Sequence, residues 1–322
     1  MVWVPAMSCP TLAPAAAQCR PARRSRRLAL WAALLLGSAA CASDSSNDDT
    51  RAAHEALARS LVWLERHRPE PGAKLGNHVL DAWAWERFAR LHPDATVRAR
   101  ARSEARSRLA ALEADAEPDF VALSYWATAL RCRAALGLDP DPLRSRLQAA
   151  DLERLLRESS PTTALWSAEL LRFSGVELTL PAGTTLLSSA AVDPDWAPSH
   201  RDAVAIYHEL AAASDFGRES VRGFSAEEIA FARRAHPVLF SVVRGEGHTD
   251  AAAEMLISGA ILGQRDEPWF ADGIVWLRTR QREDGSYMRA GQRPDPPADA
   301  RRHGIVTASW ALLESLQEED RR

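Results

Sequence analysis

Cysteine is scarce in this sequence, with four residues among 322, and three of the four fall within the first 41 positions. Only Cys132 lies beyond them, so no disulfide can form within that larger part of the chain, and a cysteine-rich metal site is excluded there. No histidine neighbours Cys132 in the sequence, and a nucleophilic thiol requires surroundings that lower its pKa. We therefore interpret Cys132 as a buried thiol without a catalytic function.

Positive charge is also in deficit. The chain has 40 basic and 43 acidic residues, and residues 1–40 contain five arginines and no acidic residue. The remaining part of the chain therefore holds 35 basic and 43 acidic residues, which gives it a net charge of −8. Proteins that bind nucleic acids require the opposite sign, because they neutralise phosphates. We expect no nucleic-acid partner.

The sequence lacks the short motifs that identify a particular enzymatic reaction. The sequence has no Gly-x-Ser-x-Gly motif, and GEGH at 245–248 has too few glycines and no following lysine for a phosphate-binding loop. We interpret GEGH as a turn between two helices. The sequence predicts no cofactor.

The N-terminal residues have the pattern of an export signal. Four arginines between 23 and 27 precede the apolar run LALWAALLLGSAA at 28–40, which is short for a membrane span. The small residues at 37–40 and the following Cys41 resemble the processing site of a bacterial lipoprotein signal peptide. This resemblance implies export to the cell envelope and a lipid on Cys41 that anchors the protein to the membrane. Plain secretion, with cleavage after the small residues, is the alternative.

This interpretation divides the chain into three segments. Residues 1–40 are a signal peptide, residues 41–50 a disordered tether, and residues 51–322 a single folded domain. The sequence ASDSSNDDT at 42–50 is polar and acidic, with no apolar residue larger than alanine. Such a segment buries too little apolar surface to fold.

From residue 51 onward, apolar residues recur with the 3.6-residue period of amphipathic helices, and the alternation typical of strands is almost absent. Breaks rich in Gly, Pro and Asp separate the periodic segments. The predicted helices are 51–68, 77–92, 96–114, 119–136, 141–158, 161–174, 199–215, 225–244, 249–264, 268–281 and 300–319. The stretch 176–189 is either extended or a short irregular helix. We expect an all-α domain of about 11–12 helices.

Two segments at opposite ends of the domain resemble each other. Residues 61–85 and 274–312 each contain a Val-Trp-Leu helix, a loop with glycine and proline, and a helix that opens at a histidine. An array of helical hairpins that closes into a ring places its first and last hairpins side by side. An open solenoid does not need matched ends.

The stretch WLRTRQREDGSY at 276–287 resembles the helix-end motif of (α/α)6 toroids, the barrel of terpenoid cyclases and protein prenyltransferases. Trp276, Gln281, Asp284 and Gly285 match the positions that join one hairpin to the next in that family. The resemblance implies an (α/α)6-type toroid of helical hairpins with a central cavity. The acidic D-D-x-x-D and D-x-D-D motifs of the cyclases are missing, so their activity is not implied.

Residues 207–217, YHELAAASDFG, give the strongest functional indication. His208 and Asp215 lie seven positions apart and share one helical face, opposite to Ile206 and Leu210. The spacing is similar to the His-x6-Asp-Phe-Gly signature of an uncharacterised bacterial domain family. That resemblance implies no particular activity.

Two further helices place a histidine on the face opposite their apolar side chains. His78 shares a face with Asp81 and Trp85, and His303 shares a face with Trp310. In a toroid the inner helices line the central cavity, where a tryptophan is better tolerated than in open water. We therefore predict a ligand-binding cavity lined by His78, Trp85, His208, Asp215, His303 and Trp310.

Two functions from different classes fit these residues. The predicted function is a binding protein whose concavity, lined by Trp and His, holds a small molecule, glycan or peptide. The alternative is a glycan hydrolase or lyase that uses His208, Asp215, His303 and Asp81 for acid–base catalysis, since these groups exchange protons near neutral pH. The histidines could instead ligate a metal together with an aspartate, or serve only to fix the helix ends. We assign no metal site.

Overall fold

The structure, a computed structural model, describes residues 45–70, 72–112, 122–176, 178, 185–287 and 296–317. These residues form thirteen helices and no strand, and their one extended pairing is an isolated antiparallel bridge between Gln281 and Tyr287. The prediction of an all-α fold is confirmed. The predicted signal peptide and Cys41 lie outside the described residues. None of the described helices is long and apolar enough to cross a membrane.

The described helices follow one another along the unit Cys41–Arg322. The first seven are α2 (Ser45–Arg66), α3 (Leu75–Leu91), α4 (Ala95–Ala110), α5 (Leu123–Ala135), α6 (Asp141–Ala149), α7 (Leu152–Glu158) and α8 (Pro161–Phe173). The next six are α9 (Leu186–Val192), α10 (His200–Ala213), α11 (Ala226–Gly245), α12 (Thr249–Ile261), α13 (Pro268–Thr279) and α14 (Ala298–Ser315).

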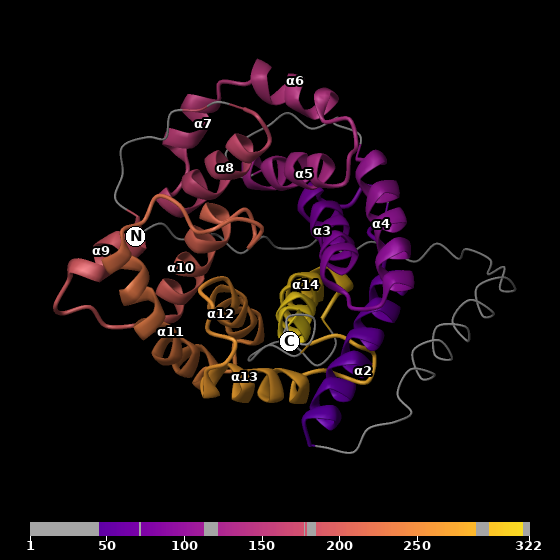
Figure 1. Cartoon of the computed structure of the whole chain (residues 1–322). Coiled ribbons are helices and arrows are strands. Elements are labelled where there is room, and N and C mark those ends of the chain that lie inside the picture. Colours follow the sequence, from indigo (N-terminus) through magenta and orange to yellow (C-terminus); the bar gives the residue numbers. More distant parts are fainter. Residues whose placement is uncertain are drawn as a thin grey trace, which may run out of the picture. The chain divides into compact units, whose positions relative to one another are not determined.

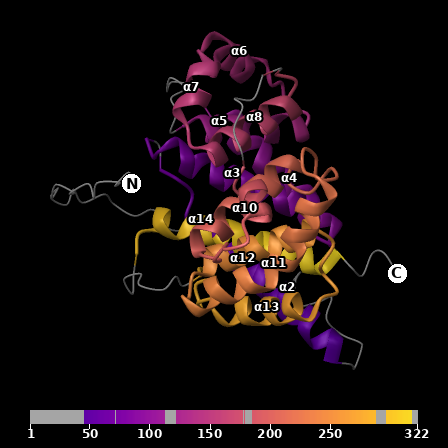
Figure 2. The ribbon, with the colours of Figure 1, turned by 90° about the vertical axis from the view of Figure 1, so that its left-hand side faces the viewer.

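Six of these helices contact one another in a closed order (Figure 1). Helix α3 packs against α5, α5 against α8, α8 against α10, α10 against α12, α12 against α14, and α14 returns to α3. Other helices pack around this series, with α4 on α3, α11 on α10 and α12, and α13 on α12 and α14 (Figure 2). This order is the one expected of a toroid of helical hairpins, whose detailed geometry stays a prediction.

Polar contacts join the first and last described hairpins. Gln281, just after α13, donates from Nε2 to the Ala56 carbonyl of α2 at 2.8 Å and accepts from Nε of Arg59 at 2.9 Å. Gly285, in the next turn, has a φ of 91°, and a Cβ at this position would overlap the Arg59 carbonyl. Gln281 and Gly285 therefore fix the end of α13 against α2.

A cluster of aromatic side chains packs between the six helices. Trp83 of α3 lies 5.5 Å, ring to ring, from Trp310 of α14 and 6.0 Å from Trp166 of α8. Phe216, just after α10, lies 5.0–6.0 Å from all three rings. Tyr207 of α10 lies 6.3 Å from both Trp166 and Trp310. All five side chains are buried, so this level of the ring is an apolar core.

The first described helix starts within the predicted tether. Helix α2 begins at Ser45, inside the segment 41–50 that we predicted to be disordered. Arg278 of α13 donates to the carbonyl and to the carboxylate of Asp49, at 2.7 and 2.5 Å. These bonds hold the first turns of α2, so residues 45–50 belong to the folded domain.

One predicted helix is divided in two. The segment 141–158 breaks at Ala150, where the backbone is extended, and Asp151 then caps α7 by accepting from the Arg154 amide at 3.0 Å. Within the stretch 176–189, residues 186–189 are helical and belong to α9, while residue 177 and residues 179–184 lie outside the described residues.

Candidate functional site

His208 of α10 contacts the aromatic core and lies within electrostatic range of His303 on α14. Its Nδ1 donates to the Val204 carbonyl at 2.7 Å, and its ring lies 4.9 Å from the rings of Trp166 and Tyr207. Burial lowers the pKa of His208 to about 4. The bond to Val204 opposes this shift, and the charge of His303 adds to it. His208 is therefore neutral at pH 7, and only its Nε2 can accept a proton.

Asp215 does not share the α10 face that carries the histidine. Helix α10 ends at Ala213, and Asp215 has the left-handed backbone conformation, with a φ of 49°. Its carboxylate is 1% exposed and accepts from Nε of Arg131 at 2.7 Å and from Arg218 at 3.2 Å. Phe216 also has a positive φ, 57°, and these two residues turn its ring into the aromatic core. Arg131 also donates from Nη2 to the second carboxylate oxygen, so the carboxylate that we predicted to line a cavity is held by arginines in a buried ion pair.

Asp81, Trp85 and Trp310 are also buried rather than exposed to a cavity. Asp81 accepts from Arg108 and, at 3.0 Å, from Arg302 of α14. The Trp85 ring is 0% exposed and lies 4.8 Å below the Arg108 guanidinium. Trp310 is 0% exposed and donates its ring N–H to Glu314 at 2.9 Å. The predicted cavity lining fails at these positions because arginines pair with the polar faces of α3 and α14.

His303 is the predicted residue that stays accessible beside carboxylates. Its side chain is 40% exposed on α14, with Nδ1 3.7 Å from Asp250 and Nε2 3.5 Å from Glu254, both on α12. Because its charge also acts on His208, these residues of α10, α12 and α14 form one polar region. His78 lies half-buried in the first turn of α3.

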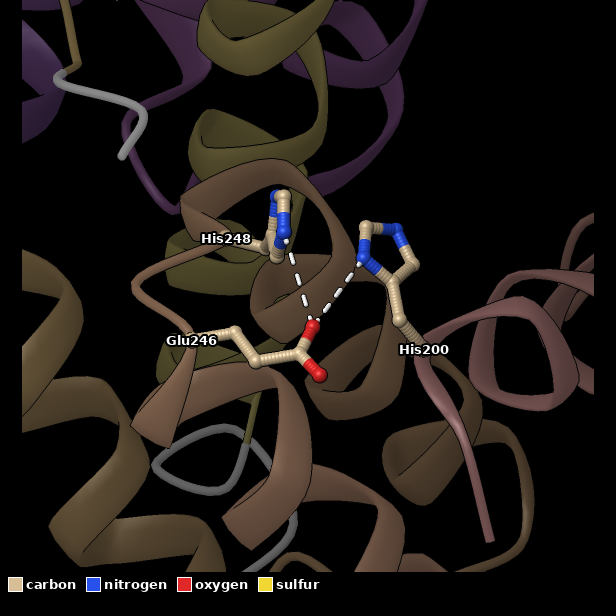
Figure 3. A group of neighbouring side chains, drawn as sticks. All are labelled: His200, Glu246 and His248. Carbon is tan, nitrogen blue, oxygen red and sulfur yellow. Dashed lines mark ion pairs between the residues drawn. The ribbon is translucent and has the colours of Figure 1, made fainter. Parts of the chain in front are cut away.

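A second group of ligand-type side chains lies where α10 and α12 begin (Figure 3). His200 opens α10, and Glu246 and His248 lie in the turn between α11 and α12. One oxygen, Oε2 of Glu246, is 3.5 Å from Nδ1 of His200 and 3.5 Å from Nε2 of His248. The two imidazole rings are 4.0 Å apart and inclined by 67°. We call these three residues the His200–Glu246–His248 cluster.

Local backbone geometry explains why the three side chains converge. Ser199 caps α10 by accepting from the Asp202 amide, which fixes His200 at the first helical position. Gly247 has a φ of 72°, and this left-handed residue reverses the chain between Glu246 and His248. The His248 amide then donates to the Val243 carbonyl at 2.9 Å, which ends α11. The turn that we predicted for GEGH is therefore present, and it also presents two ligand-type side chains.

The cluster has the donor set and the spacing of a metal site. A tetrahedral Zn²⁺ with bonds of about 2.0–2.1 Å holds its ligand atoms about 3.4 Å apart. The two measured nitrogen–oxygen distances are 3.5 Å, longer than a good hydrogen bond, and all three ligand atoms lie within 4.8 Å of one another. The two histidines are half-buried, and Glu246 is exposed to solvent.

Sequence reasoning missed this cluster because its parts are weak signals. A Glu-x-His pair in a helix–helix turn has no standard metal spacing, and His200 lies 46 residues before Glu246. The only available signal was a histidine directly after a capping serine, together with a histidine in the turn before α12. Neither signal indicates a partner without the ring that brings α10 beside α12.

Comparison with known proteins gives a family but no activity. No curated protein shows significant similarity to the chain. One family model matches residues 65–308, which include the His200–Glu246–His248 cluster and every residue of the aromatic core except Trp310. The prediction of an uncharacterised domain family is confirmed, while the resemblance to terpenoid cyclases stays a prediction. The chain belongs to the family described as Domain of unknown function (DUF6895).

Proposed function

We propose that the protein binds a divalent metal ion, best matched by Zn²⁺, through His200, Glu246 and His248. The observation that carries this proposal is the pair of equal 3.5 Å distances from one Glu246 oxygen to one nitrogen of each histidine. Two imidazoles and one carboxylate are ligands that zinc accepts, and three protein ligands leave a fourth position for water or substrate. This assignment replaces the initial expectation of a chain without a metal.

In this proposal the metal site lies at the end of a toroid where the inner helices begin. We call this end the mouth. The closed contact order of α3, α5, α8, α10, α12 and α14 supports an (α/α)6 arrangement with these helices inside. His200 and His248 lie at the beginnings of α10 and α12, and Asp250 and His303 follow on α12 and α14. Trp85 and Trp310 are buried, so a small molecule, glycan or peptide would bind above the aromatic core, at this mouth.

The location that fits this proposal is the outer side of a bacterial membrane. The arginines before residue 28, the apolar run 28–40 and the following Cys41 support export and a lipid anchor. In this arrangement the folded domain begins within a few residues of the anchored Cys41, since α2 starts at Ser45. The metal site would then face the envelope compartment.

A second candidate function is acid–base catalysis on a glycan, by hydrolysis or elimination. The observation that favours it is the accessible His303 beside the carboxylates of Asp250 and Glu254. A histidine flanked by carboxylates can exchange protons near neutral pH. Asp81 and Asp215 are not available for this role, because arginines engage both. If His303 has this catalytic role, a His303→Gln variant loses catalytic turnover of the glycan and keeps its affinity for zinc.

Isothermal titration of the full chain with Zn²⁺ tests the metal proposal, with Mg²⁺ as the control ion. We expect one Zn²⁺ per chain and weakening by at least about 10-fold in Glu246→Gln, which removes the charge of the shared ligand. Glu219→Gln is the matched control, because the Glu219 and Glu246 side chains are both 48% exposed. Absence of zinc binding in the unmodified chain, or equal loss in both variants, overturns the proposal.

A further inference from the structure

A cavity that shares no residue with the metal cluster lies where α3, α4 and the segment after α10 meet. Its volume is about 240 Å³, and its charged lining consists of Glu86 and the four arginines Arg90, Arg98, Arg102 and Arg218. Glu86 and Arg90 come from α3, Arg98 and Arg102 from α4, and Arg218 from the turn that follows Asp215. The cavity is therefore strongly basic, although the chain as a whole carries a net negative charge.

The one carboxylate of this lining is already engaged. Glu86 is 3% exposed, pairs with the adjacent Arg87 and accepts from Arg218 at 2.5 Å. Burial alone would raise the pKa of Glu86, but Arg87, Arg218 and Arg90 together lower it to about 2. Glu86 is therefore ionised, and its charge is balanced by arginines other than those of α4.

The remaining arginines have few carboxylate partners. Arg90 shares Glu314 with Arg265, at 3.6 Å from one Glu314 oxygen, while Arg265 donates to the other at 2.5 Å. Arg98 donates to two backbone carbonyls, and among the described residues no ion pair involves Arg98 or Arg102. The positive charges of Arg98 and Arg102 are therefore not paired with a carboxylate of the described residues.

Arg90 contributes a further positive charge to the cavity wall, held close to other arginines. Its Nη2 donates to the Phe216 carbonyl at 2.9 Å, while its Nε is buried without a hydrogen-bond partner. Burial, followed by repulsion from Arg87 and Arg218, lowers the pKa of Arg90 to about 9. An anion in the cavity would reduce the repulsion between these arginines by balancing part of their charge.

We propose that this cavity binds a small multivalent oxyanion, such as phosphate or an organic carboxylate, through Arg90, Arg98 and Arg102. Guanidinium groups match the planar geometry of two oxygens on one ligand, and hydrogen bonds between ionised partners are about twice as strong as neutral ones. The volume of about 240 Å³ accommodates a phosphate or a small tricarboxylate. The site is independent of the proposed metal function, because it shares no residue with the His200–Glu246–His248 cluster.

Titration of the full chain with inorganic phosphate and, separately, with citrate tests this proposal. Both titrations are carried out at constant ionic strength against sodium chloride, after protein and buffer have been passed over a chelating resin to remove divalent ions. We expect saturable binding of at least one of the two anions, and the preferred anion distinguishes a phosphate ligand from a carboxylate ligand. The same affinity is expected in Glu246→Gln, which separates this site from the metal cluster.

The variant Arg102→Gln is expected to weaken anion binding by about 10-fold, the loss of one charge-assisted contact. Arg102 is exposed and outside the buried ion pairs, so its replacement leaves the fold intact. The control is Arg157→Gln on α7, whose side chain is 62% exposed and remote from the cavity lining. No saturable binding of either anion beyond the chloride control, or equal weakening in both variants, overturns the proposal.

Discussion

Arg302 of α14 donates from Nη1 to Oδ1 of Asp81 at 3.0 Å, and the two residues are separated by 221 positions in the sequence. The same guanidinium donates from Nη2 to the His67 carbonyl at 2.7 Å. Both side chains of the pair are almost fully buried. Arg302 therefore connects α14 to α3 through the ion pair and to the end of α2 through the His67 carbonyl.

Removal of the Asp81 charge should be costly. Asp81→Asn leaves Arg302 and Arg108 with a neutral partner in a buried site, and breaking a buried pair costs about 3–5 kcal/mol. Urea denaturation at pH 7, followed by circular dichroism, measures the free energy of unfolding. The control is Glu158→Gln, which breaks an exposed pair with Arg154 and should cost at most about 1 kcal/mol. Equal effects of the two substitutions would contradict the structural importance of the buried pair.

Two glycines with similar backbone conformations should respond differently to alanine. Gly285 has a φ of 91°, and its Cβ would overlap the Arg59 backbone, whereas Gly137 has a φ of 66° and open space around it. Gly137→Ala should cost about 1–2 kcal/mol from backbone strain alone. Gly285→Ala should cost at least about 3 kcal/mol, because α13 must also move away from α2. Thermal denaturation of both variants measures this difference, and a Gly285→Ala protein as stable as Gly137→Ala refutes it.

Stability should decline in mild acid because of buried histidines. His236 is fully buried, its Nδ1 donates to the Ala232 carbonyl at 2.6 Å, and burial lowers its pKa to about 4. The unfolded chain has a histidine pKa of about 6.5, so it binds more protons than the folded chain between these values. The stabilisation is complete above pH 6.5 and is lost as the pH falls toward 4. At pH 5 the loss from this one residue is on the order of 2 kcal/mol.

The pH dependence of unfolding in His236→Gln checks this assignment. The variant should lose less stability than the original chain between pH 7 and pH 5, whatever its stability at pH 7. His208 and His92, whose pKa values burial also lowers to about 4, should retain part of the dependence. An unchanged slope in the variant would show that His236 does not titrate in this range.

Zinc should stabilise the folded chain through the histidine cluster. At a free concentration 100 times its dissociation constant, a ligand that binds only the folded state adds about 2.7 kcal/mol. His200→Ala should abolish the zinc-dependent increase in melting temperature, and EDTA should reverse the increase in the unmodified chain. The His236→Gln variant serves as a histidine control outside the cluster. A zinc-dependent increase that survives His200→Ala argues against the proposed ligands.

Sequence periodicity predicted most of the helices, because apolar spacing and capping residues are local properties. The resemblance around Gln281 and Gly285 also indicated the right type of contact, since these residues join α13 to α2. Helical periodicity did not predict the position of Asp215. It places Asp215 on the same helical face as His208, but α10 ends at Ala213 and Asp215 has a left-handed backbone conformation. The end of helix α10 just before Ser214 depends on the packing of Phe216 in the aromatic core. This packing is a tertiary contact, so the local sequence pattern does not show it.

The site could be predicted only in part for a similar reason. The polar faces of α3 and α14 were identified correctly as unusual, but Asp81 faces Arg302 and Arg108 rather than a ligand. An aspartate in a cavity and an aspartate in a buried ion pair have the same helical pattern. Only the neighbour, which is distant in the sequence, distinguishes them, and the same is true of His200 and Glu246.

The closure of the ring by α14 also constrains when the protein can fold. A chain that grows at about 5–20 residues per second needs roughly 10–45 s to add the 221 residues between Asp81 and Arg302. During that interval Asp81 lacks one of its two arginines, and Trp83 lacks the ring of Trp310. The incomplete domain therefore exposes apolar surface until its final helix arrives, so its yield in a cell depends on protection of the nascent chain against aggregation.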